Sequence, residues 1–207
     1  MSTKILFAGG GTAGHVEPAL AVASWLRSKK PDWQYQFIGT KTGLENQLVP
    51  EAGFELRHIP KVLMPRQLTP STLFWPVKIL IATWQGIKIC KDADLIIGFG
   101  GYACPPLYLA GAILRKPIFI HEANAIPGWA NKLGAPFASK IFIAFSRAGL
   151  KIGRWKNAIL SGMPIRAEII SSTFESKEVI STKRQAQLEK WRLSADKQTV
   201  LVFGGSL

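Results

Sequence analysis

The chain has 207 residues, of which 47% are hydrophobic and 19% charged, and it contains 19 glycines. This composition is typical of a globular α/β protein with one domain, or one domain and part of another, and it excludes a disordered or fibrous chain. The formal net charge of +13 predicts anionic partners. We expect no nucleic acid among them, because the basic residues are scattered and no nucleic-acid-binding motif accompanies them.

Apolar runs of strand type alternate with helical segments over the first 166 residues. Strands are expected at Ile5–Ala8, Gln34–Ile38, Glu55–Ile59, Leu95–Gly98, Pro117–Ile120, Lys140–Ile143 and Ala158–Leu160. Helices are expected at residues 17–29, 43–51, 75–91, 105–114 and 128–135. This alternation predicts an α/β fold, a Rossmann-like parallel sheet with helices on both faces, whose ligands bind beyond the carboxyl ends of the strands.

A glycine loop follows the first strand. Gly9, Gly11 and Gly14 have the G-x-G-x-x-G spacing, and such a loop before a helix predicts a phosphate site. A dinucleotide would also need an acidic residue at the end of the second strand, where this chain has the sequence GTK and its next acid is Glu45. NAD or FAD is therefore disfavoured, and dinucleotide binding would also leave His15, beside the expected phosphate, without a role.

The stretch QLTPSTLFWPVKILIATW, residues 67–84, combines aromatic and basic residues at the start of a predicted helix. Leu73, Phe74 and Trp75 come just before Pro76, and Lys78 follows. A Trp/Phe/Leu face beside basic groups is typical of proteins that bind an anionic membrane surface. Packing of Leu73, Phe74 and Trp75 on the sheet is the alternative, and the sequence leaves both open.

Residues 95–114 carry no charge over a length that could span a membrane. Because Gly100-Gly101 and Pro105-Pro106 interrupt this stretch, we predict a strand, a glycine turn and a helix instead. The N-terminus has none of the features of a signal peptide. Cys90 and Cys104 have no C-x-x-C or metal-ligand spacing, which predicts a reduced, metal-free cytosolic protein.

Four unusual loops follow predicted strands, at residues 9–15, 98–102 (GFGGY), 121–128 (HEANAIPG) and 161–166 (SGMPIR). The carboxyl ends of parallel strands lie at one edge of a sheet, so we expect these loops to form one site. After Arg166 the composition becomes polar, with a helix expected at residues 182–192, and TVLVFGGSL predicts a new strand and glycine turn. The expected organisation is a Rossmann-like domain at 1–166, a linker and start of a second domain at 167–198, and the first strand and glycine turn of that domain at 199–207, within a longer protein.

Together the loops resemble one family, the bacterial MurG glycosyltransferases. The resemblance is carried by GGGTAGHVEPALAVA, IGFGGY, HEANAIPGWANKL, SGMPIR and FGGSL, in the order and spacing of the family. It implies the GT-B architecture, two Rossmann-like domains facing across a cleft, with this chain as the N-terminal, acceptor-binding half. The chain departs from many members at Ala13, where they have glycine, and at Ala103 and Cys104, where they have serine and glycine.

The resemblance implies an inverting transferase that moves N-acetylglucosamine from UDP-N-acetylglucosamine to the C4 hydroxyl of the muramoyl sugar of lipid I. The product, lipid II, serves peptidoglycan synthesis, and with it cell shape and cell division. The implied location is peripheral, on the anionic inner surface of the cell membrane at its cytoplasmic face. No cofactor and no metal are expected, because no carboxylate or histidine cluster has ligand spacing. The 207-residue chain alone is expected to be inactive.

The resemblance assigns the acceptor contacts to two glycine-rich loops. Backbone N–H contacts with the ligand phosphates are assigned to Thr12, Ala13 and Gly14. A second anion-binding turn, with a tyrosine close to the acceptor, is assigned to Gly100, Gly101 and Tyr102.

Two residues are candidates for the proton transfer. His15 has an unperturbed pKa near neutrality, although it would alternatively only hydrogen-bond the acceptor pyrophosphate. Glu122 is a second candidate base, or it orients neighbouring polar groups. Asn124 matches a ligand-binding residue of the family, and Arg166 and Ser206 match contacts with the donor diphosphate.

Two other functions stay open at this point. In the first, the chain acts only as a membrane-docking module that binds a lipid pyrophosphate and catalyses no reaction. Alternatively, it would belong to a related GT-B enzyme with another acceptor.

Overall fold

The structure is a computed structural model that describes residues 2–63, 73–146, 153–172 and 176–200. The chain divides into two compact units, Met1–Pro164 and Ile165–Leu207. The first unit contains the sheet and the four unusual loops except for the end of the last one. The second unit is small and helical in its described part.

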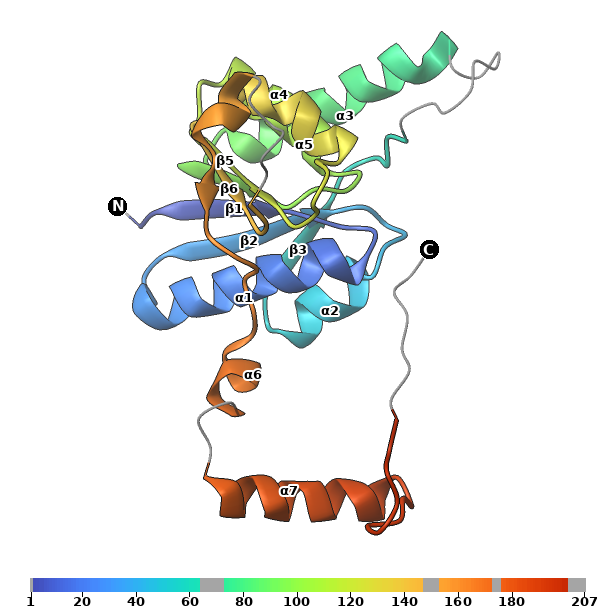
Figure 1. Ribbon diagram of the computed structural model, residues 1–207. Coiled ribbons are helices and arrows are strands. Elements are labelled where there is room, and N and C mark those ends of the chain that lie inside the picture. Colours follow the sequence, from blue (N-terminus) through green and yellow to red (C-terminus); the bar gives the residue numbers. More distant parts are fainter. Residues whose placement is uncertain (1, 64–72, 147–152, 173–175, 201–207) are drawn as a thin grey trace. The chain divides into compact units, whose positions relative to one another are not determined.

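The first unit is built on a seven-stranded, fully parallel sheet (Figure 1). Its strands are β1 (Lys4–Ala8), β2 (Gln34–Gly39), β3 (Glu55–His58), β4 (Leu95–Gly98), β5 (Ile118–Glu122), β6 (Lys140–Ile143) and β7 (Ile159–Leu160). Their order is β3-β2-β1-β4-β5-β6-β7. The chain adds β2 and β3 on one side of β1 and then adds β4 to β7 on its other side, so the strand order switches between β1 and β4. In open parallel sheets, ligands bind at such a switch point.

Helices cover both faces of the sheet, as Figure 1 shows: α1 (Ala13–Lys29) and α2 (Glu45–Glu51) on one face, and α3 (Trp75–Cys90), α4 (Cys104–Ile113) and α5 (Trp129–Gly134) on the other. Short 3₁₀ segments, η2 (Ala135–Phe137) and η3 (Gly153–Asn157), join the last strands. The predicted Rossmann-like fold is confirmed. Residues 95–114 form β4, a glycine turn and α4, as predicted, and no helix of the described residues is long and apolar enough to cross a membrane.

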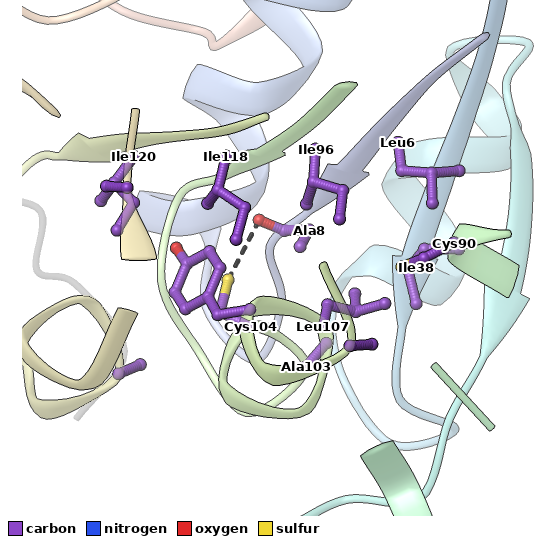
Figure 2. Close-up of a cluster of buried hydrophobic side chains, with 14 of the residues drawn as sticks. Leu6, Ala8, Ile38, Cys90, Ile96, Ala103, Cys104, Leu107, Ile118 and Ile120 are labelled. Atoms are coloured by element: carbon purple, nitrogen blue, oxygen red, sulfur yellow. Dashed lines mark hydrogen bonds between the residues drawn. The ribbon is translucent and has the colours of Figure 1, made fainter. Parts of the chain in front are cut away.

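Alternate residues of β1 enter two separate cores, which is why its sequence is continuously apolar. Ile5 and Phe7 pack with α1 in the core that contains Phe37. Leu6 and Ala8 point to the opposite face, where Figure 2 shows them with Ile38, Ile96, Leu107, Ile118 and Ile120. The sheet is therefore buried on both sides, and its strand ends are held at fixed positions.

Some predicted boundaries were wrong. Helix α1 begins at Ala13, not near residue 17, because Thr12 at the end of the glycine loop is its N-cap residue, and Pro18 lies inside the helix. His15 is therefore firmly helical. Strand β5 runs to Glu122, two residues further than predicted, since its pairing with β6 continues to Ile143.

The second unit contains α6 (Ala167–Ser172), which the sequence did not predict, and α7 (Lys177–Lys190), predicted at residues 182–192. Helix α7 starts earlier because Ser176 caps it, its hydroxyl oxygen accepting a bond from the Val179 amide at 3.4 Å. Thr199 and Val200 have no regular secondary structure, and the rest of the strand predicted over 199–207 lies outside the described residues.

Candidate functional site

Two glycine loops meet at the switch point of the sheet. The loop after β1 passes directly against the loop after β4, and a side chain on Gly101 would come within 2.2 Å of the Gly10 carbonyl oxygen. Gly100 and Gly101 have φ values of +99° and +89°, which residues other than glycine rarely adopt. Glycine at these positions is thus required both by backbone conformation and by space.

His15 lies where these loops meet, in the first turn of α1. Its Nδ1 lies 3.3 Å from the Gly10 carbonyl oxygen and 3.2 Å from the Thr12 hydroxyl. Because a carbonyl oxygen only accepts, Nδ1 is the protonated nitrogen, and Nε2 keeps its lone pair. Burial lowers the pKa of His15, although the Gly10 bond and the charges of Glu122 and Glu45 oppose this. The neutral imidazole is therefore favoured, with Nε2 able to accept a proton.

The N-terminus of α1 offers unpaired amides beside His15. Thr12 is the N-cap residue, with extended backbone angles, and its side chain does not cap the helix. Ala13 and Gly14 are exposed in the first turn. The first amides of a helix have no partners within the helix and carry a partial positive charge, so they can donate to an anion.

Glu122 is almost fully buried, at 1% exposure, and both of its carboxylate oxygens accept hydrogen bonds. Oε1 accepts from the backbone and side-chain nitrogens of Asn124, both at 2.9 Å. Oε2 accepts from the Gly128 amide at 2.9 Å and from the Asn131 side chain at 3.1 Å. This carboxylate is suited to holding the loop after β5 in shape.

A series of buried hydrogen bonds holds Glu122 in place. The hydroxyl of Tyr108, which is fully buried, donates to Asn131 Oδ1 at 2.8 Å, and the Asn131 amide donates to Glu122. Cys104 lies beside Tyr108, and its Sγ donates to the Ala8 carbonyl at 3.2 Å (Figure 2). The Gly100 carbonyl lies 3.1 Å from the same sulfur. These contacts tie β1, the β4 loop and the β5 loop together.

A cavity of about 160 Å³ opens between the three loops. It is lined by seven of the predicted site residues: Thr12, His15, Gly100, Gly101, Tyr102, Glu122 and Asn124. Ala13 and Gly14 follow Thr12 on α1. Arg166 is exposed at the start of α6 in the second unit, where its carbonyl accepts from the Ile169 amide at 3.0 Å. Ser206 lies outside the described residues.

Sequence reasoning missed two polar residues of this site. Asn131 lines the cavity but looks like an ordinary residue of a short helix in the sequence. Glu45 is fully buried behind the first glycine loop, and the sequence had marked it only as too late in the chain for a ribose-binding acid. The only available signal was an acid set among glycines, at GTKTGLE.

The predicted membrane-contact residues lie at the start of α3, and three of the four are exposed. Leu73 and Phe74 are 80% and 61% exposed, and Lys78 is exposed too. Trp75 is half-buried and packs on the cluster of Val62 and Ile79. Trp75 thus combines packing on the domain with partial exposure, and the membrane role of these residues stays a prediction.

The exposed face of α3 continues the apolar surface beyond the predicted residues. Val77, Leu80, Ile81 and Trp84 are all exposed and follow the i, i+3, i+4, i+7 spacing of one helix face. The Lys88 ammonium lies 3.4 Å from the centre of the Trp84 ring. Helix α3 thus presents an apolar stripe flanked by Lys78 and Lys88.

Metal ligation has no candidate in the parts of the chain that the structure describes, where no group of three or more His, Cys, Asp or Glu side chains is arranged to hold an ion. Cys90 and Cys104 are both free, buried thiols.

The strand order, with glycine loops and a histidine at the switch point, defines a Rossmann-type α/β domain. A family model, the glycosyltransferase family 28 N-terminal domain, matches residues 5–143. The chain therefore belongs to glycosyltransferase family 28.

The resemblance to MurG proteins is confirmed at the level of sequence. The chain is 43% identical over 205 residues to the UDP-N-acetylglucosamine--N-acetylmuramyl-(pentapeptide) pyrophosphoryl-undecaprenol N-acetylglucosamine transferase of Thermobifida fusca, covering 98% of this chain and 51% of the relative. Identity to the transferase of the same name from Rhodococcus erythropolis is 42%, covering 98% and 53%. The chain thus spans about half the length of these relatives.

Solved structures agree with this placement. The crystal structure of Acinetobacter baumannii MurG has a TM-score of 0.65 and 30% identity, covering 80% of this chain and 46% of that protein. A UDP-N-acetylglucosamine 2-epimerase, at 14% identity and a TM-score of 0.54, covering 72% and 43%, shares the fold alone.

Proposed function

We propose that this chain is the acceptor-binding half of an inverting N-acetylglucosaminyltransferase. The reaction moves N-acetylglucosamine from UDP-N-acetylglucosamine to the C4 hydroxyl of the muramoyl sugar of lipid I and gives lipid II for peptidoglycan synthesis. The names of the relatives support the substrates. The observation that carries the proposal is His15, whose Nε2 keeps its lone pair beside a cavity between two loops suited to phosphate.

The acceptor diphosphate is bound at the N-terminus of α1. The amides of Thr12, Ala13 and Gly14 donate to its oxygens, and the Gly100-Gly101 turn with Tyr102 forms the second wall. The cavity of about 160 Å³ is smaller than the ~300–1,000 Å³ of most ligand pockets, so in this proposal it encloses only part of the acceptor.

His15 acts as the general base in this proposal. Nε2 takes the proton of the acceptor hydroxyl while its oxygen bonds to the anomeric carbon, and the bond from that carbon to the UDP oxygen breaks on the opposite side. The lowered pKa of His15 keeps the base neutral at pH 7. Glu122, the other candidate base, is proposed to orient the loop that carries Asn124, because both of its carboxylate oxygens accept hydrogen bonds from this loop or from α5.

The donor half of the reaction rests on the MurG resemblance. Arg166 and Ser206 would contact the diphosphate of the UDP donor, with a guanidinium suited to two phosphate oxygens. The domain division proposed for this arrangement is 1–166, 167–198 and 199–207. The 207-residue chain by itself is proposed to bind acceptor without transferring sugar.

The exposed stripe of α3 is proposed to place the protein on the anionic inner surface of the cell membrane, at its cytoplasmic face. A patch of this kind on a soluble domain marks an interaction site, and the acceptor's lipid tail lies in that membrane. Leu73, Phe74 and Lys78 belong to this surface. Because the proposed product is lipid II, the protein would contribute to cell-wall growth, and through it to cell shape and cell division.

The test is transfer of labelled N-acetylglucosamine to a lipid I analogue by the full-length gene product. Loss of a general base costs about 10²–10⁴-fold in rate, so His15→Ala should lose most of the transfer. His58→Ala is the matched control, because His58 is exposed at the edge strand β3 and does not line the cavity.

The alternatives give different results in the same assay. Analogue binding without transfer by the full-length product would indicate a membrane-docking module. Transfer to a different lipid-linked or soluble acceptor would indicate a related GT-B enzyme, and undiminished transfer by His15→Ala would remove His15 from the mechanism.

A further inference from the structure

A carboxylate is buried directly behind the first glycine loop. Glu45, the first residue of α2, has no solvent exposure. Its Oε2 accepts the Gly11 amide at 2.8 Å, and its Oε1 accepts the Thr40 amide at 2.9 Å and the Thr40 hydroxyl at 3.1 Å. One side chain therefore joins the loop after β1 to the loop after β2.

The surrounding backbone leaves room for this side chain and for little else. A Cβ on Gly10 would lie 2.6 Å from Oε1, and one on Gly39 would lie 2.5 Å from Cγ. A Cβ on Gly43 would lie 1.8 Å from Oε2. Glycines of two loops, the one after β1 and the one after β2, thus enclose the Glu45 carboxylate. Among the described residues, no Lys, Arg or His forms a salt bridge with it.

A buried, unpaired charge is costly to a fold unless strong hydrogen bonds compensate for it. Charge-assisted bonds to backbone amides provide that compensation here, and they fix the peptide they hold. The fixed peptide is that of Gly11, which has a φ of +90° and packs against the Tyr102 ring. Gly11 immediately precedes Thr12, the N-cap of α1.

We propose that Glu45 is a positioning residue of the acceptor site. By holding the Gly11 amide from behind, the carboxylate sets the turn that directs the next amides, at the N-terminus of α1, toward a ligand diphosphate. It also fixes Gly11 against Tyr102 on the cavity wall. This role rests on the proposed function, because it assumes that a phosphate group binds at this loop.

The experiment compares Glu45→Gln with the wild-type chain, using inorganic pyrophosphate as the probe. Glutamine has the same shape, but its NH₂ group must face a backbone N–H at Gly11 or Thr40, so one bond is lost. We expect the amide proton resonances of these two residues to shift and the Kd for pyrophosphate to rise about tenfold or more. Glu51→Gln is the matched control, since Glu51 is exposed at the other end of α2.

A second readout is the titration of the His15 imidazole by NMR. The charges of Glu45 and Glu122 both raise the pKa of His15 against the effect of burial. Removing the Glu45 charge should therefore lower that pKa further, whereas Glu51→Gln should leave it unchanged. A purely structural glutamate far from the site would not produce this pattern.

The outcomes separate the two levels of the proposal. Wild-type binding of pyrophosphate that Glu45→Gln leaves unchanged would overturn the role of Glu45 alone. Failure of the wild-type chain to bind pyrophosphate would overturn the acceptor site and, with it, the positioning role. If Glu45→Gln does not fold, hydrogen exchange of the wild-type chain provides the test. Fast exchange of the Gly11 amide proton would contradict its bond to the Glu45 carboxylate and overturn the positioning role.

Discussion

A side chain on Gly101 would approach within 2.2 Å of the Gly10 carbonyl oxygen, so the loops after β1 and β4 are in backbone contact. These two strands are neighbours in the sheet, on either side of the point where its order reverses. Because neither loop has a side chain at the contact, the two strand ends come close enough for His15, at the start of α1, to line the same cavity as Gly100 and Glu122.

Gly101→Ala should separate these loops and destabilise the first unit. The control is Gly53→Ala, because Gly53 also has a positive φ, +72°, but its Cβ would meet nothing closer than 3.7 Å. The control should lose about 1–2 kcal/mol of unfolding free energy from backbone strain alone. Gly101→Ala should lose about 1–3 kcal/mol more from overlap. Equal losses in urea unfolding would contradict the contact.

Asn131→Ala should remove hydrogen bonds from three buried polar groups, the Tyr108 hydroxyl, Glu122 Oε2 and the His121 carbonyl. The Tyr108 hydroxyl loses its acceptor, and Glu122 Oε2 loses one of its two donors. We expect the free energy of unfolding to fall by about 2–4 kcal/mol. Asn157→Ala, at an exposed asparagine of the same unit, should change it by less than about 0.5 kcal/mol. Similar values for the two variants, measured by urea unfolding, would argue against this series of buried hydrogen bonds.

Acidification should destabilise the first unit. Burial lowers the pKa of both His15 and His121 in the folded chain, whereas unfolded histidines titrate near pH ~6.5. Below that pH the unfolded chain binds more protons, so stability is complete above about pH 6.5 and is lost as the pH falls through the lowered folded values. Urea unfolding between pH 7.5 and 5.5 should show this loss.

His121→Gln should weaken the same pH dependence. His121 is buried, and its Nε2 donates to the Gly162 carbonyl at 3.1 Å, a bond that a glutamine amide can also make. With one of the two titrating groups removed, the loss of stability from pH 7.5 to pH 5.5 should be smaller. An unchanged slope would show that protonation of His121 is not linked to unfolding.

Neither cysteine should react with a maleimide in the folded chain. Burial raises the pKa of Cys90 to about 12 and that of Cys104 to about 11, and the thiolate is the reactive form. Mass spectrometry should find no label after native treatment at pH 7 and two labels after denaturation. Rapid native labelling of one site would show that its surroundings open to solvent.

Trp84→Ser should weaken binding to vesicles that contain phosphatidylglycerol. Trp84 lies on the exposed stripe of α3, and Trp25 has similar exposure on α1, on the other face of the sheet (Figure 1). Loss of the apolar burial of a large side chain should raise the vesicle Kd about tenfold or more for Trp84→Ser. Trp25→Ser should have little effect. Equal effects in a co-sedimentation assay would contradict a membrane role of α3.

Much of the fold could be predicted because its signals are local. Strands buried on both faces, such as β1 and β4, are short continuous apolar runs, and the glycine and proline pairs of residues 95–114 divide strand from helix. Boundaries were less certain where two local signals conflict. Pro18 is typical of the first turn of a helix, but α1 already begins at Ala13, directly after the glycine loop.

The sequence by itself determined the parallel α/β sheet, the position of the glycine loops at strand ends and the membership of this family, because periodicity, turn residues and motifs are written along the chain. Only the tertiary structure decided which polar groups are buried together. Glu45 is far from Gly11 in sequence, and Asn131 is far from Tyr108, yet each pair is joined by a hydrogen bond. It also decided that Trp75 packs inward while Trp84 faces out, because the exposure of an apolar residue depends on what packs against its helix.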